Sequence, residues 1–286
     1  MAIYIEVDVT QFKKVRVPEL LFHPSKFGGS VWPHHADEYP QTREPTAMPM
    51  PKLLCLHGRR SNAEVTEMQC QGVLELDKVA ALHYLDAPFE STAFDKDIGG
   101  GRSWVIKDEP PETKQETLRQ SLIHIVRKIA SDGPFDGVYG FSQGAAIASL
   151  LCEPAVHGAL GLTAPPFRFI LLVCGADYDK AFGAGVAQEF MGACAAQEDA
   201  ARQLQEVQHP PAAASRSSLL QLPSLHLMGE KDDILASSQE LTQRYAQPQL
   251  LFHKSGHAVP AMELCTGEGV QLTNRLRSFI QKPGYA

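Results

Sequence analysis

Residues 137–148 of this 286-residue chain read GVYGFSQGAAIA, an apolar run followed by a turn and then by small residues. The apolar run predicts a buried strand that ends near Gly140, and the small residues predict a helix that begins near Gln143. The turn carries the pattern G-x-S-x-G, with Ser142 at its centre. Such a turn strains the serine backbone, and a side chain on Gly140 or Gly144 would collide with the strand or the helix. Ser142 is therefore the candidate nucleophile.

The short pattern can also occur by chance, so its surroundings carry the argument. A strand is expected before it, and the residues after it include Ala145, Ala146 and Ala148, which permit close packing on a sheet. The positive N-terminal end of the expected helix would point toward the hydroxyl of Ser142. This combination favours a nucleophile over a chance match.

The composition predicts a soluble globular protein, large enough for one sizeable α/β domain. Hydrophobic residues make up 44%, charged residues 21%, and the formal net charge is -7 without clusters of Lys or Arg. We therefore expect neither nucleic acid nor an anionic membrane surface as the main partner, and no membrane insertion. The first residues lack the features of a signal peptide. The six cysteines show no metal-ligand spacing, which indicates a reducing, cytoplasmic location; they are Cys55, Cys70, Cys152, Cys174, Cys194 and Cys265.

Strands and helices alternate along most of the chain. Continuous apolar runs predict strands buried on both faces of a parallel sheet. Amphipathic stretches between them predict helices around residues 63–76, from Pro110 to Gly133 and near residues 272–280. The fold class is therefore α/β, with a mostly parallel sheet flanked by helices on both faces. The strands are expected at residues 52–56, 82–86, 136–140, 169–174, 224–228 and 249–253.

Two segments fall outside this pattern. Residues 1–51 begin with an alternating stretch that predicts an edge hairpin and continue as an irregular, proline-rich segment, so they form an N-terminal extension. The main domain is expected to cover residues 52–286. It carries an Ala- and Gln-rich insertion near residues 183–217, which is either a lid over the pocket or a surface elaboration.

A serine hydroxyl needs a base to accept its proton, and two later stretches supply the necessary groups. GEKDD at residues 229–233 follows a predicted strand and offers Asp232, with Asp233 as the alternative carboxylate. SGHAVP at residues 255–260 follows the last predicted strand and offers His257. The order Ser, Asp, His is the chain order of the α/β-hydrolase triad. His257 would take the proton, and Asp232 would orient the imidazole and stabilise its charge.

Simpler interpretations of these residues are open. Asp232 and Asp233 could form a solvated turn or cap a helix, and a Gly-His pair could belong to an ordinary loop. Three other histidines compete for the role of base. His226 and His253 lie within predicted strands and are expected to be structural, whereas His57 is expected to shape the turn after the first buried strand.

An oxyanion in the reaction also needs hydrogen-bond donors. The backbone N–H of Gln143 is one expected donor, because it follows the nucleophile at a helix N-terminus. The N–H of Arg59, in the turn after the first buried strand, is the other. A further loop, IGGGRSW at residues 98–104, has glycines that allow motion. Its Trp104 would either line the substrate pocket or pack the loop onto the core.

Together these motifs resemble the eukaryotic family of serine hydrolases called FSH. The resemblance covers residues 52–281 and implies an α/β-hydrolase fold with a triad of Ser142, Asp232 and His257. It also implies esterase activity on acyl or alkyl esters, or thioesterase release of acyl or polyketide chains. The N-terminal extension and the length of the insertion depart from the family pattern. The matching segments are LCLHG (54–58), DAP (86–88), GRSW (101–104), GPFDG (133–137), GFSQGAA (140–146), LHLMGE (225–230) and GHAVP (256–260).

The expected function is hydrolysis of a carboxylic ester through an acyl-enzyme on Ser142, and the alternative is a thioesterase with the same triad. A peptidase or acyltransferase would use the same intermediate. A non-catalytic ligand-binding protein of this fold is a hypothesis from another class, but such a protein could dispense with a triad residue, whereas all three are present. The expected substrate is a small-molecule or carrier-bound acyl ester or thioester. Neither a metal nor an organic cofactor is expected, and the sequence does not indicate an oligomeric state.

Overall fold

A computed structural model of the chain describes residues 50–93, 99–162, 164–190, 219–260 and 267–282. Nearly all of the predicted N-terminal extension and most of the predicted insertion lie outside these residues. The hairpin, the domain boundary near residue 51 and the choice between lid and elaboration therefore stay predictions. Among the described helices, none has the length and apolar character needed to cross a membrane.

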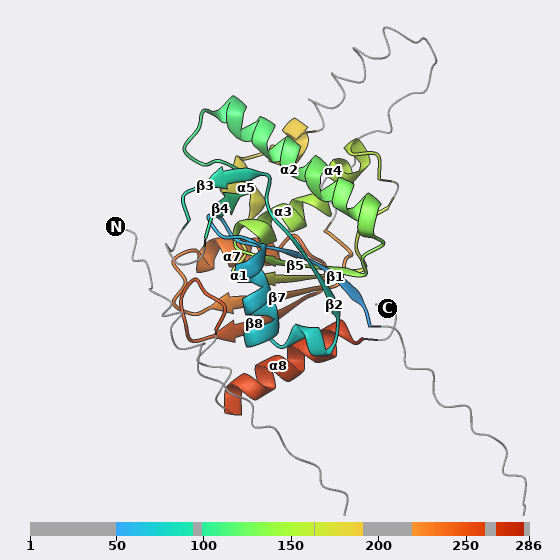
Figure 1. The fold of residues 1–286 in the computed structure, drawn as a ribbon, viewed down its shortest axis with the longest axis vertical. Coiled ribbons are helices and arrows are strands. Elements are labelled where there is room, and N and C mark those ends of the chain that lie inside the picture. Colours follow the sequence, from blue (N-terminus) through green and yellow to red (C-terminus); the bar gives the residue numbers. More distant parts are fainter. Residues whose placement is uncertain (1–49, 94–98, 163, 191–218, 261–266, 283–286) are drawn as a thin grey trace, which may run out of the picture. The chain divides into compact units, whose positions relative to one another are not determined.

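The core of the described chain is a six-stranded parallel sheet in the order β2-β1-β5-β6-β7-β8 (Figure 1). Each predicted strand is present, so the α/β class is confirmed. The residues of β6 and β7 are buried throughout, which explains the continuous apolar run of β6 and the mostly apolar sequence of β7. The strands are β1 (Lys52–Leu56), β2 (Ala81–Leu85), β5 (Gly137–Phe141), β6 (Phe169–Val173), β7 (Ser224–Gly229) and β8 (Pro248–His253).

Side chains of the sheet alternate between two hydrophobic clusters, one on each face. In β1, Leu54 and Leu56 belong to the first cluster, while Leu53 and Cys55 belong to the second, because successive strand residues point to opposite faces. Helices α2 to α5 and α7 contribute to the first cluster, and α8 contributes to the second (Figure 1). The helices are α1 (Ala63–Glu67), α2 (Pro111–Asp132), α3 (Gln143–Leu151), α4 (Pro154–Ala159), α5 (Tyr178–Phe182), α7 (Leu235–Thr242) and α8 (Gly267–Ile280).

The predicted helices are found with one difference. Helix α2 follows Pro110 and is capped by Gly133, and α8 buries Leu276 and Ile280, both as expected. Residues 63–76 do not form one regular helix. A π-helical segment, Met68–Val73, follows α1 directly, and Gly72 within it has a low helix propensity.

Part of the predicted insertion packs into the core, although its first residues, Gly183 and Ala184, are exposed. Residues 186–190 are helical, and Val186, Ala187 and Phe190 are buried in the first hydrophobic cluster. The Ala- and Gln-rich composition of the whole stretch concealed these apolar positions. The buried residues show that this part of the predicted insertion contributes to the core, and the role of residues 191–217 stays a prediction.

Residues 101–103 differ from the flexible loop that the neighbouring glycines suggested. Gly101–Ser103 forms strand β4, which pairs antiparallel with β3 (Phe89–Ser91). A Cβ atom on Gly101 would lie 2.5 Å from the Cα of Ala93. This glycine therefore serves a close approach of two backbone segments, and not motion.

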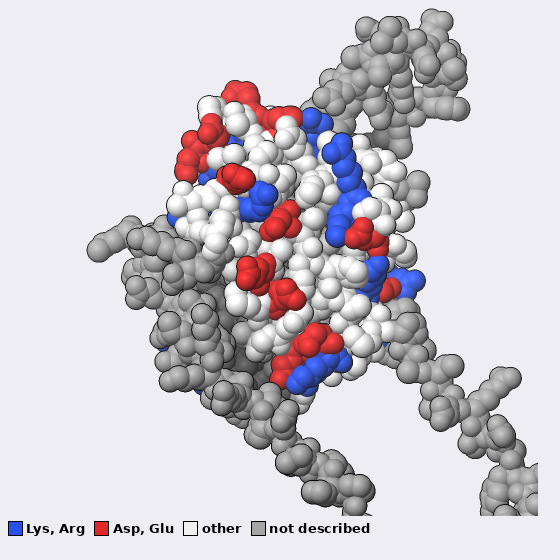
Figure 2. Space-filling model, viewed as in Figure 1, with Lys and Arg blue, Asp and Glu red and all other residues white. Residues whose placement is uncertain are grey.

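Charged side chains are dispersed over the face shown in Figure 2. Acidic and basic side chains are interspersed there among uncharged ones, and the described residues of this face form no broad basic area. This distribution agrees with the absence of Lys and Arg clusters in the sequence.

Candidate active site

The turn between β5 and α3 holds Ser142 in a strained backbone conformation. Its φ is 52° and its ψ is -114°, values that residues with a side chain rarely adopt. A Cβ atom on Gly140 would lie 2.6 Å from the Cα of Ala145, and one on Gly144 would lie 2.4 Å from the carbonyl oxygen of Leu56. Both glycines are therefore required by the packing of strand against helix, as the sequence predicted.

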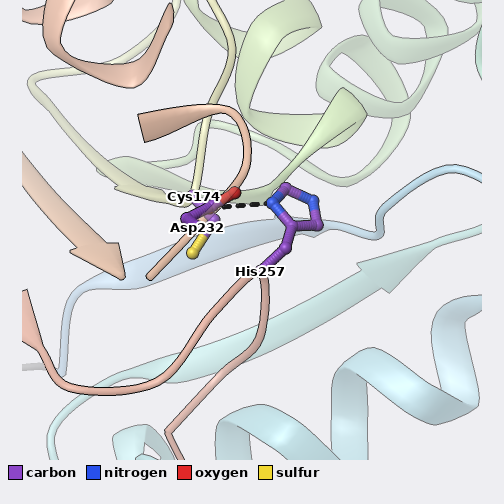
Figure 3. Close-up of side chains that lie close together, drawn as sticks. All are labelled: Cys174, Asp232 and His257. Atoms are coloured by element: carbon purple, nitrogen blue, oxygen red, sulfur yellow. Dashed lines mark hydrogen bonds and ion pairs between the residues drawn. The ribbon is translucent and has the colours of Figure 1, made fainter. Parts of the chain in front are cut away.

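Three side chains from separate loops form one hydrogen-bonded chain. The Oγ of Ser142 lies 2.8 Å from Nε2 of His257. The Nδ1 of His257 lies 2.9 Å from Oδ2 of Asp232 (Figure 3). These residues follow β5, β8 and β7, so the parallel sheet brings its carboxyl ends together at this point. The structure thus unites the three residues that the sequence singled out.

The carboxylate that contacts His257 is that of Asp232. Its side chain is 1% exposed, while the side chain of His257 is 36% exposed. Asp233 is exposed and has no place in this hydrogen-bonded chain. Burial opposes ionisation of Asp232, but hydrogen bonds from His257 and from the Ile234 N–H outweigh it and hold the pKa of Asp232 below its usual value. The group is therefore an anion at neutral pH.

The loops that carry Asp232 and His257 are fixed against each other by their backbones. The N–H of Glu230 donates to the carbonyl of His253, and the N–H of Lys231 donates to the carbonyl of Ser255. A Cβ atom on Gly229 would lie 2.3 Å from the carbonyl oxygen of Gly256. Glycine at position 229 thus lets the two loops approach closely enough for the side chains to meet.

The turn after β1 is held in place by two buried side chains, His57 and Trp104. His57 is fully buried, accepts the N–H of Ala87 at Nε2 and donates from Nδ1 to the carbonyl of Gly58. Trp104 packs on the imidazole and donates from Nε1 to the carbonyl of His57. His57 therefore shapes the turn, as expected. Arg59, two residues after His57 in the same turn, is exposed.

The side chain of Gln143 has a role that sequence reasoning missed, because only its backbone N–H was considered. Its Oε1 accepts the N–H of Trp104 at 2.9 Å, and its Nε2 donates to the carbonyl of Val105 at 2.9 Å. The amide therefore ties the segment after β4 to the N-terminus of α3. Hydrogen bonds from a side-chain amide to the backbone N–H and carbonyl of a distant segment cannot be recognised in the sequence.

This geometry can be compared with known proteins. A family model described as serine hydrolase (FSH1) matches residues 47–268 of the chain. The chain belongs to the FSH1 serine hydrolase family. The resemblance drawn from the motifs is thereby confirmed, and with it the α/β-hydrolase fold.

Several curated relatives of this FSH1-family protein are named esterases. Esterase FPY3 of Fusarium mangiferae is 28% identical over 232 residues, which cover 75% of this chain and 91% of that protein. Esterase OVCA2 of Xenopus tropicalis is 28% identical over 231 residues, which cover 73% and 86%. Among solved structures, acyl-protein thioesterase 2 of Zea mays is similar with a TM-score of 0.47 and 17% identity, over 83% of this chain and 97% of that chain.

Trp104 was expected either to line the substrate pocket or to pack its loop onto the core. The surroundings of its side chain favour packing onto the core. The side chain is fully buried, and its backbone carbonyl accepts a hydrogen bond from Ser121 of α2. We expect Trp104→Ala to lower the free energy of unfolding by about 3–5 kcal/mol, because it removes a large buried ring. The relative rates on esters of different chain length should stay the same.

Urea denaturation and an ester panel would test this expectation, with Trp104→Phe as a control that keeps most of the buried ring. A Trp104→Ala protein with unchanged stability and a shifted chain-length preference would contradict it.

The stability of the folded protein should depend on pH because two of its histidines, His57 and His226, are buried. Burial lowers the pKa of His57 from 6.5 to about 4, and that of His226 from 6.5 to about 3. Between pH 6.5 and 4 the unfolded chain binds more protons than the folded one, so acidification favours unfolding. By pH 5 each histidine should reduce the free energy of unfolding by about 2 kcal/mol.

Urea denaturation at pH 7 and pH 5 measures this loss. His226→Gln should remove about half of it, because glutamine does not titrate. Equal free energies of unfolding at the two pH values would contradict this expectation, because they would mean that the two imidazoles bind protons equally well in the folded and the unfolded protein.

Cys174 lies beside the hydrogen-bonded chain, which the sequence did not reveal. It directly follows β6 with a positive φ of 47°, and its thiol lies 3.6 Å from the carbonyl oxygen of Ala258 and 3.7 Å from Nε2 of His253. Burial and the nearby Asp232 carboxylate raise the pKa of Cys174 to about 12. The residue is buried and free, as predicted, but its surroundings are those of the candidate site.

Proposed function

We propose that this FSH1-family protein hydrolyses carboxylic esters through an acyl-enzyme on Ser142. The observation that carries the proposal is the continuous chain from Ser142 Oγ to His257 Nε2, at 2.8 Å, and from His257 Nδ1 to Asp232 Oδ2, at 2.9 Å. Hydrogen-bond distances of this size are those needed for a base to activate a serine. The esterase names of curated relatives support the same class of reaction.

In the proposed reaction, Oγ of Ser142 attacks the acyl carbon while its proton passes to Nε2 of His257. Asp232 accepts the Nδ1–H of His257, which keeps Nε2 free to accept a proton, and then stabilises the imidazolium. His257 returns the proton to the leaving alcohol. A water molecule, deprotonated by His257, attacks the acyl-enzyme and releases the acid.

The oxyanion would be held by the backbone N–H groups of Gln143 and Arg59. Gln143 opens α3, where the first N–H groups have no partner within the helix. Gly58, directly before Arg59, lies beside the nucleophile, since a Cβ atom on it would be 3.4 Å from Cβ of Ser142. Because Gln143 also ties the Trp104 segment to α3, and Trp104 bonds the His57 carbonyl, both donors belong to one connected framework.

The proposed substrate is a small-molecule or carrier-bound acyl ester, and a thioester would form the same acyl-enzyme. The described cysteines are free and buried, which supports a role in a reducing compartment such as the cytoplasm.

A fluorophosphonate probe with intact-mass analysis tests the proposal, followed by kinetics on matched oxygen esters and thioesters with the same acyl chain. We expect a single adduct on Ser142 and turnover of the oxygen esters. Higher kcat/KM for thioesters, relative to their uncatalysed rates, would assign the protein as a thioesterase. Absence of both labelling and turnover would favour the non-catalytic binding protein.

A further inference from the structure

Three different metal-ligating groups meet at the ends of three neighbouring strands. Cys174, Asp232 and His257 follow β6, β7 and β8, and one donor atom from each lies within 4.8 Å of the other two. Figure 3 shows the thiol and the carboxylate on the same side of the His257 ring. Among the residues that the structure describes, this is the one such group of three.

The donor set matches the chemistry of zinc. Thiolate, imidazole and carboxylate are the kinds of side-chain group that bind Zn²⁺ in proteins. The ion prefers four ligands, arranged in a tetrahedron. Magnesium and calcium prefer oxygen donors and would gain little from the sulfur. We propose that Zn²⁺ binds Cys174, Asp232 and His257 and thereby inhibits the enzyme reversibly.

Binding requires small movements of the loops. Zinc lies about 2.0–2.3 Å from its ligands, so the 2.9 Å contact between Nδ1 of His257 and Oδ2 of Asp232 must open slightly to place the ion between them. Cys174 and Asp232 are buried, whereas the His257 side chain is 36% exposed. The ion therefore enters from the side of His257. The carbonyl of Ala258, 3.6 Å from Sγ of Cys174, or a water molecule would supply the fourth ligand.

The proton balance explains why zinc would inhibit. The Cys174 thiol gives its proton to solvent as the sulfur–zinc bond forms. His257 ligates through Nδ1, so its single ring proton moves to Nε2. Nε2 faces Ser142 Oγ at 2.8 Å and can then only donate to it. Zinc thus removes the base without touching the nucleophile, and it also occupies the Asp232 carboxylate.

The inhibition rests on the proposed function, but metal binding does not, so the two are measured separately. In metal-free buffer, Cd²⁺ serves as a spectroscopic probe, because a thiolate bound to it gives a charge-transfer absorption in the ultraviolet. Zn²⁺ is followed by calorimetry and by its effect on ester hydrolysis, with EDTA to reverse the effect. The variants are Cys174→Ala and Cys174→Ser, and the matched control is Cys152→Ala, a buried cysteine in the first hydrophobic cluster.

We expect the parent protein and Cys152→Ala to show the Cd²⁺ band and inhibition by Zn²⁺ that EDTA reverses. Both Cys174 variants should lose the band and require at least about tenfold more Zn²⁺ for half-inhibition, each compared with its own zinc-free rate. Unchanged zinc sensitivity in a folded Cys174 variant would overturn the proposal. A Cd²⁺ band that depends on Cys174 in a protein without esterase activity would refute the proposed function and retain the metal site.

Discussion

Ser142→Ala should reduce kcat for ester hydrolysis on the order of 10⁴-fold or more and abolish labelling by a fluorophosphonate. The hydroxyl is the atom that His257 contacts at 2.8 Å, and alanine offers no group to form the acyl-enzyme. The backbone N–H of residue 142 donates to the carbonyl of Val173 in either protein, so the turn itself should persist. Kinetics with a chromogenic ester and intact-mass analysis measure both effects.

Two further variants separate chemistry from folding. Ser142→Gly should be equally inactive, yet more stable than the parent by about 1 kcal/mol, because glycine adopts a φ of 52° without steric cost. Ser131→Ala, at an exposed position near the end of α2, serves as the matched control and should keep full activity. Near-normal turnover by Ser142→Ala would remove Ser142 from the mechanism.

Local sequence patterns predicted the parts of the fold that depend on nearest neighbours. The buried strands appear as continuous apolar runs because helices cover both faces of the sheet. The elbow was predictable because Gly140 and Gly144 stand at positions where any Cβ atom would meet backbone. The order of Ser142, Asp232 and His257 followed from the parallel topology, in which successive strands end at the same edge.

Contacts between distant segments could not be predicted in this way. Gln143 bonds the backbone of residues 104 and 105, and the pattern around it specifies only its N–H. Cys174 has the apolar sequence surroundings of a core residue, yet it lies beside Asp232 and His257. The glycines near residue 101 indicated flexibility, while Gly101 in fact permits two backbones to touch. In each case the deciding partner is far away in the chain.

The second large effect on kcat is expected at Asp232, and it distinguishes this residue from its neighbour Asp233. Asp232→Asn should lower kcat by about 10³–10⁴-fold, whereas Asp233→Asn should change it by no more than about twofold. The asparagine amide at position 232 would donate to Nδ1 of His257 and leave its proton on Nε2, where it blocks acceptance of the Ser142 proton. The carbonyl oxygen of the same amide can still accept the Ile234 N–H, which Oδ1 accepts now, so the loop should keep its shape.

Asp233→Asn is the matched control, because it makes the same chemical change one residue later, on a side chain that is exposed and outside the chain to His257. Kinetics of both variants on one ester, with thermal melts to confirm folding, measure the contrast. A larger loss at Asp233 than at Asp232 would mean that the working enzyme uses the neighbouring carboxylate, and that the contact at 2.9 Å is structural.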